Sequence, residues 1–131
     1  MESNKMFFKE CHLAGAMYYD LDEVFEELTV GTRLELLRDK DNRFDGNAVA
    51  VMYHSMEGEA VHIGYIPRAD NELIASMLDM GWGKIFRCTI GRICPEAHYE
   101  GQIHLKISIL KNEESSQSNN RDRRKKNQST Y

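Results

Sequence analysis

The sequence lacks the long apolar run that a membrane helix requires. No stretch approaches the ~20 apolar residues needed to cross a bilayer. The polar start of the chain has only the Phe7-Phe8 pair behind it, which is too short for the apolar part of a secretion signal. The three cysteines are odd in number and unclustered, which argues against a disulfide framework. Together these absences predict a cytoplasmic protein that does not enter membranes.

The familiar motifs of catalysis and metal binding are also missing. There is no GxxxxGK[ST] phosphate loop, which argues against ATP hydrolysis, and no recognisable Ser-His-Asp or paired-carboxylate arrangement. Folding could bring some cysteines and histidines together, but neither a C-x-x-C nor an H-x-x-x-H pair supports a zinc site; these residues are Cys11, His12, Cys94, His98 and His104. We therefore predict no enzyme, no metal and no cofactor. A small hydrolase with an unrecognised active site is the least favoured alternative.

Composition divides the chain into two parts. With 131 residues, 41% of them hydrophobic, the chain has room for one domain with one core. From residue 113 onward serine, glutamine, asparagine and charged residues dominate, and such a segment buries too little apolar surface to fold. The sequence predicts one domain over residues 1–112 and a disordered polar and basic tail over residues 113–131.

Charge is divided unevenly between these parts. Residues 1–114 hold 12 Lys and Arg against 20 Asp and Glu, whereas residues 115–131 hold five basic residues against one acidic residue. An acidic domain is poorly suited to bind nucleic acid, because much of that affinity comes from neutralising phosphates. A nucleic-acid-binding function would therefore need its basic residues gathered on one face, or charge supplied by the tail, or binding that is not mainly electrostatic.

Apolar patterning predicts six short strands, each bounded by turn residues. In the last of them Leu105 and Ile107 fall on the dry face and Lys106 on the wet one. Many short strands of this kind indicate a mainly β (α+β) fold that forms a small closed or nearly closed barrel. The strands are expected over residues 7–14, 32–38, 48–53, 60–66, 85–93 and 103–110.

Two short helices are expected between the strands. Asp20 and Glu23 have the spacing of a capping box at the start of the first helix. Asp70 or Asn71 is expected to cap the second. The apolar stripe of this second helix has helical spacing and consists of Leu73, Ile74, Met77 and Leu78.

Three short motifs occur along the predicted barrel. Each places aromatic, polar or charged residues beside a predicted strand. In order they read Gly15-x-x-Tyr18-Tyr19, then Asn42-x-Phe44-Asp45-x-Asn47-Ala48, then Ile63-Gly64-Tyr65-Ile66-Pro67-Arg68.

In this order and with these spacings, the motifs resemble those of the HIRAN domain, and the resemblance extends over residues 8–110. HIRAN domains are small six-stranded OB-like barrels, found alone in bacteria and phages and fused to DNA-repair helicases in eukaryotes. The resemblance implies a stand-alone bacterial or phage-type member that binds single-stranded DNA. Its ligand would be a DNA 3′ end held in a pocket. Its context would be DNA repair, replication or phage-related DNA metabolism, beside a helicase or nuclease partner.

The resemblance also implies roles for individual residues. Tyr18, Tyr19 and Phe44 would stack on bases, an interaction worth ~1–3 kcal/mol per base that tolerates any sequence. Asp45 would accept a hydrogen bond from a terminal hydroxyl. Tyr65 and the phosphate-binding pair Arg43 and Arg68 complete the predicted DNA site. Simpler interpretations are that the tyrosines pack at the barrel rim, that Asp45 caps a turn, and that Arg68 is only solvated.

The sequence departs from the family pattern in three places. Met17 stands where an arginine usually precedes the tyrosine pair, and Arg43-Phe44 replaces a Pro-aromatic pair. After Arg68 the usual basic residues give way to Ala69-Asp70-Asn71-Glu72. Basic residues are lost at the first and third of these places, which disfavours tight DNA binding, whereas Arg43 adds a positive charge. The acidic balance favours the main alternative, a protein-interaction or adaptor barrel without DNA affinity.

Overall fold

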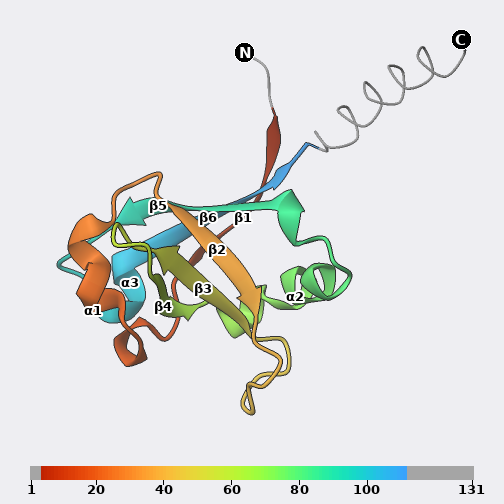
Figure 1. Ribbon diagram of the computed structural model, residues 1–131, viewed down its shortest axis with the longest axis horizontal. Coiled ribbons are helices and arrows are strands. Elements are labelled where there is room, and N and C mark those ends of the chain that lie inside the picture. The colour runs from red at the N-terminus through yellow and green to blue at the C-terminus, as the bar shows by residue number, and fades with distance from the viewer. Residues whose placement is uncertain (1–3, 112–131) are drawn as a thin grey trace, which may run out of the picture.

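The computed structural model describes residues 4–111, which contain six antiparallel strands (Figure 1). The sheet has the strand order β1-β6-β5-β2-β3-β4. The mainly β, OB-like prediction is confirmed, and the predicted strands agree with the observed ones to within two residues at each end. The strands are β1 (Lys5–His12), β2 (Arg33–Arg38), β3 (Val49–His54), β4 (Ala60–Tyr65), β5 (Phe86–Ile93) and β6 (Ile103–Leu110). The predicted tail lies outside the described residues, and the boundary at residue 112 stays a prediction.

The two edge strands, β1 and β4, approach each other just after β1 ends. The Ala14 N–H donates to the Tyr65 carbonyl and the Tyr65 N–H to the Ala14 carbonyl, both at 2.8 Å. This is an isolated bridge rather than a ladder, so the sheet curls into a barrel that its strand ladders do not close. Gly64 permits the approach, because a Cβ at that position would lie 2.7 Å from the Ala14 carbonyl oxygen and 2.8 Å from the Leu13 side chain.

Replacing Gly64 by alanine should therefore destabilise the domain by about 1–3 kcal/mol, since the extra methyl group meets backbone and a fully buried leucine. Chemical denaturation would measure the loss. Gly46→Ala is the matched control, because nothing lies within 4 Å of its Cβ position and its φ is not positive. If both variants were equally stable, the close approach at the bridge would be wrong.

The inner face of the sheet forms the core. As predicted, Leu105 and Ile107 of β6 are fully buried and Lys106 is exposed. β3 is buried along most of its length, and its sequence is largely apolar. Ser108 lies on the same face as Lys106, which was expected to be exposed, but Ser108 is buried there. It lies between Phe7 of β1 and Arg87 of β5.

The helices are short and lie at the ends of the barrel (Figure 1). α1 (Leu21–Val24) continues into a 3₁₀ turn, α2 (Glu72–Asp79) is the second predicted helix, and α3 (Tyr99–Gln102) was not predicted. No helix within residues 4–111 is long and apolar enough to cross a membrane. The predicted apolar stripe on α2 is wrong at Leu73, which is exposed; the buried positions are Ile74 and Ala75.

The predicted N-cap positions are correct for both helices, but neither capping side chain bonds to its helix. Asp20 stands before α1 without a side-chain capping bond, because its backbone (φ −93°, ψ 27°) is not in the extended conformation that a capping residue adopts. Asn71 occupies the N-cap position of α2, but its side chain is used elsewhere, in a contact with the 42–48 loop.

Candidate functional site

The 42–48 loop between β2 and β3 is held in shape by its own side chains. Asn42 Oδ1 accepts the N–H of Phe44 at 2.8 Å and that of Asp45 at 3.0 Å. The Ala48 N–H donates to the Asp45 carbonyl at 3.2 Å, which leads the loop into β3. These bonds are typical of Asx-rich turns. They present the Asp45 side chain toward the turn that follows β4.

Both carboxylate oxygens of Asp45 have partners. Oδ1 accepts the Asn47 N–H at 2.9 Å, Oδ2 accepts the Asn71 side-chain amide at 2.8 Å, and Arg68 Nε lies 3.7 Å from Oδ2. Partial burial acts to raise the pKa of Asp45, but the two hydrogen bonds and the Arg68 charge outweigh it and hold that pKa below its ordinary value. Asp45 is therefore an ionised acceptor at neutral pH.

Asn71 is a positioning residue that the sequence did not reveal. It is 1% exposed, and its Oδ1 has no hydrogen-bond partner among the described residues. The polar contact of its side chain is thus the one to Asp45, 26 positions away in the chain. Arg68 adds a second link to the loop by donating to the Phe44 carbonyl.

Tyr19 of the first motif and Tyr65 of the third form an aromatic cluster with His62. The Tyr19 ring stacks on His62 with 4.2 Å between centroids and meets Tyr65 edge-on at 5.3 Å. Tyr65 donates its hydroxyl hydrogen bond to Asp39 at 2.5 Å. Burial, together with this bond, raises the pKa of Tyr65, so its hydroxyl stays protonated and acts as a donor. Tyr18 is different, since 77% of it is exposed.

Five of the seven predicted site residues line one cavity of about 230 Å³, here called the tyrosine cavity. Tyr18, Tyr19, Asp45, Tyr65 and Arg68 all contribute to its wall, together with Ala14, Gly15, Asn42, Ala48 and Ile66.

The other two predicted residues, Arg43 and Phe44, lie outside this lining, at the exposed tip of the 42–48 loop. Phe44 is 87% exposed.

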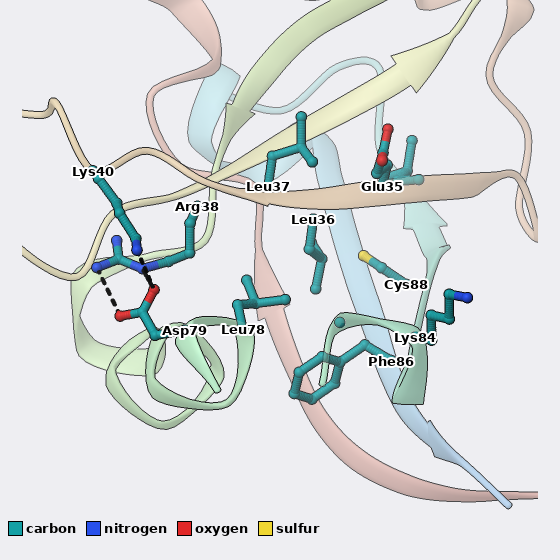
Figure 2. Close-up of a pocket in the computed structure, with 12 residues that line it drawn as sticks. Glu35, Leu36, Leu37, Arg38, Lys40, Leu78, Asp79, Lys84, Phe86 and Cys88 are labelled. Carbon is teal, nitrogen blue, oxygen red and sulfur yellow. Dashed lines mark hydrogen bonds and ion pairs between the residues drawn. The ribbon is translucent and has the colours of Figure 1, made fainter. Parts of the chain in front are cut away.

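A second, larger cavity of about 550 Å³ lies between β2, the start of β5 and α2 and contains none of the predicted residues (Figure 2). Its wall includes Arg38, whose guanidinium donates to the carboxylate of Asp79 at 2.9 Å and 3.2 Å. The same guanidinium donates to the carbonyls of Ala48 at 2.8 Å and Gly46 at 3.0 Å. Arg38 therefore braces the 42–48 loop from the side away from the tyrosine cavity.

Within residues 4–111, no three His, Cys, Asp or Glu side chains are placed so that they could hold a metal ion. Two of the three cysteines, Cys11 and Cys88, are free thiols buried in the core. Burial raises the pKa of Cys11 to about 12, so this thiol is unreactive.

Comparison with known proteins gives the same family as the three sequence motifs. Residues 6–110 match the HIRAN domain. Over 65 residues, half of this chain, the sequence is 35% identical to a Fanconi-associated nuclease 1 homolog of Oryza sativa subsp. japonica. That match covers 7% of the rice protein, so the chain corresponds to a small part of it.

Solved structures share the fold. A crystal structure of a protein from Lactobacillus plantarum superimposes with a TM-score of 0.65 at 22% identity, over 82% of this chain and 96% of that one. The HIRAN domain of human HLTF superimposes with a TM-score of 0.54 at 17% identity, over 86% and 85%. Because the family match spans most of the chain and includes the three motifs that meet at the tyrosine cavity, the protein belongs to the HIRAN domain family.

Proposed function

We propose that this protein is a DNA-binding module, not catalytic by itself, that holds the 3′-OH end of single-stranded DNA in the tyrosine cavity. The observation that carries the proposal is the composition of this cavity: tyrosine rings, an ionised carboxylate and an arginine meet in one space. The membership of this protein in the HIRAN domain family supports a DNA-binding role.

Asp45 supplies the chemistry that distinguishes an end from the middle of a strand. A carboxylate repels phosphates, so an acid in a DNA site needs a donor on its ligand, and a terminal 3′-hydroxyl is such a donor. Each carboxylate oxygen has two lone pairs, so the present partners of Asp45 leave acceptor capacity for a hydroxyl. Arg68, 3.7 Å from the carboxylate, reduces the repulsion of the neighbouring phosphate.

Aromatic side chains supply the affinity that is independent of sequence. Tyr18 offers an exposed ring at the cavity wall, while Tyr19 is already stacked on His62 and serves as the fixed side of the site. Arg43 and Phe44, which are exposed at the tip of the loop, would contact the nucleotides that precede the end. Base stacking on such rings contributes ~1–3 kcal/mol per base.

The context we propose is DNA repair or replication in the cytoplasm, beside a helicase or nuclease. The sequence match to a rice protein that is by name a nuclease supports such a partner. The acidic balance of residues 1–114 favours a second candidate, an adaptor barrel that binds protein and no DNA.

A comparison of two oligonucleotides tests the proposal. A strand with a free 3′-OH should bind more than tenfold tighter than the same strand with a 3′-phosphate, because the phosphate removes the donor and brings charge against Asp45. A tenfold preference corresponds to about 1.4 kcal/mol, the upper end of the ~0.5–1.5 kcal/mol of a neutral hydrogen bond, and fluorescence anisotropy would measure it. Equal binding of both strands would contradict end recognition, and binding of neither would favour the adaptor.

Asp45→Asn should reduce this preference and leave the fold intact. The new amide can still accept from the Asn47 N–H. Its NH₂ can donate to Asn71 Oδ1, which has no partner in the described chain, once the Asn71 amide turns over. Asp41→Asn is the matched control, an exposed acid of the same loop region that does not line the cavity.

A further inference from the structure

Four basic side chains of β2, β5 and β6 have no carboxylate within ion-pairing distance among residues 4–111. They are Arg33 of β2, Arg87 and Arg92 of β5, and Lys106 of β6, and the same holds for Arg43 and Lys84, which lie outside the strands. Other cations of the domain differ in this respect, since Lys9, Arg38, Lys40 and Arg68 each pair with an aspartate. An unpaired cation on a protein surface keeps its full charge available to a ligand.

Strand pairing places these four residues on one face of the sheet. Lys106 stands opposite Thr89, and Thr89 stands opposite Arg33, so all three side chains project to the same side. Arg87, two residues before Thr89, projects to that side as well. Arg92 reaches it through a bulge that pairs it with His104, two residues before Lys106. We call this surface the cationic sheet face.

The cationic sheet face is turned away from the core. The residues that alternate with its members are buried, namely Cys88, Ile90, Leu105 and Ile107. Gly91 adds no side chain to the centre of this face, where a Cβ would lie 3.4 Å from the Cβ of Lys106. In Figure 1, β5, β6 and β1 lie side by side, so the surface is one continuous layer.

This concentration of positive charge occurs in a domain that is otherwise acidic. Residues 1–114 hold eight more acidic than basic residues. Around the four cations the carboxylates are few. Glu10 of β1 stands opposite Lys106 but beyond ion-pairing distance, and Glu35 of β2 is paired with His54 at 2.8 Å. A basic face on an acidic domain attracts and orients a polyanion.

The aromatic residues show which form of nucleic acid suits this face. Single-stranded DNA is bound on rings that stack with its bases, and two of the three exposed tyrosines among the described residues, Tyr18 and Tyr19, belong to the tyrosine cavity. On the cationic sheet face, Phe7 of β1 is the one strongly exposed aromatic among the described residues. Duplex DNA stacks its bases internally and presents phosphates, so it needs cations rather than rings.

The cationic sheet face and the tyrosine cavity meet at α3. Glu100 accepts the Gly15 N–H at 2.9 Å, and Gly15 lines the cavity. Its other oxygen lies 3.0 Å from Nε2 of His12, which stands opposite His104 at the edge of the cationic sheet face. One DNA molecule that changes from single strand to duplex can therefore contact both surfaces.

We propose that the cationic sheet face binds the phosphate backbone of duplex DNA that adjoins the single-stranded 3′ end. The protein then recognises a 3′ overhang rather than a free strand. This inference rests on the proposed function for the choice of DNA, but on different residues.

The test uses two DNA ligands, a single strand with a free 3′-OH and the same strand as the 3′ overhang of a duplex. The full chain should bind the overhang duplex at least tenfold tighter at low salt. Arg87→Gln/Lys106→Gln should lose most of that gain and keep its affinity for the single strand. The slope of log K against log salt for the duplex should become less steep by about 1.8, at about 0.9 per phosphate contact.

Lys40→Gln/Lys84→Gln is the matched control, since it removes the same charge from exposed lysines beside the larger cavity. If the first double variant failed to fold, Arg33→Gln/Arg92→Gln would replace it. The inference is overturned if wild type binds the overhang duplex no tighter than the single strand. It is also overturned if the variant of the cationic sheet face binds the overhang duplex as tightly as the control variant does. If wild type did not bind the single strand, but Arg87→Gln/Lys106→Gln still weakened binding of the duplex, only the proposed function would be overturned.

Discussion

Replacing Leu105 by alanine should destabilise the domain by about 2–5 kcal/mol, because the lost side-chain atoms leave a cavity that the core only partly refills. Leu105 is 0% exposed and lies in the middle of β6. It stands between Cys11 of β1 and Ile90 of β5, both of which are also buried. Three strands therefore meet around this one side chain. Urea denaturation would give the change in the free energy of unfolding.

The neighbouring residue provides the control. Lys106 projects to the opposite, exposed side of the same strand, so Lys106→Ala should change stability by no more than about 0.5 kcal/mol. Similar losses at positions 105 and 106 would show that the face assignment of β6 is wrong.

Replacing Arg38 by alanine should weaken DNA binding although Arg38 does not line the tyrosine cavity. The variant loses the two charge-assisted bonds that hold the carbonyls of Gly46 and Ala48, and with them the outer support of the 42–48 loop. Bonds to a charged group contribute about 1.5–3 kcal/mol, and we expect a stability loss in that range. Fluorescence anisotropy and denaturation would measure the two effects on the same protein.

The Arg38 prediction also has a pH dependence. Hydrogen bonding from Arg38 lowers the pKa of Asp79 below 3.8, so this pair stabilises the folded state above that pH and the stabilisation is lost as pH falls through the lowered pKa. The stability difference between wild type and Arg38→Ala should shrink in that acidic range.

Lys40→Ala is the comparison, since Lys40 is exposed and reaches Asp79 at 3.7 Å without touching the loop. If Arg38→Ala bound DNA as tightly as Lys40→Ala, the loop would not depend on its brace.

Local patterning was enough to predict the strands and the motifs. In β6 the alternation of Ile103, Leu105 and Ile107 with polar residues reports one buried face, and the strand has the predicted bounds. Turn residues such as those of the 42–48 loop mark the ends of strands by their own backbone preferences. Five of the seven predicted site residues come together in one cavity. The first motif follows β1, the second leads into β3 and the third ends β4, and β4 lies beside both β3 and the residues that follow β1.

Helix ends were predicted less well, because side chains there had competing partners. Asn71 has the residue type and position of a cap, yet its amide contacts Asp45, a bond that exists only after β3 and β4 have paired. In α2, Leu73 has the spacing of a core residue, but the orientation of the short helix on the barrel leaves it exposed. Neither outcome is visible in the residues next to these positions.

The sequence by itself therefore determined the strands, their buried faces and the three motifs, since each depends on neighbours within a few residues. The tertiary structure alone decided which distant side chains meet. It placed Arg38 against the 42–48 loop and His62 beneath Tyr19, and it gathered the unpaired cations of three strands on one face of an acidic domain. The physical reason is strand register: it sets which residues stand opposite one another, and it is settled by the packing of the whole core.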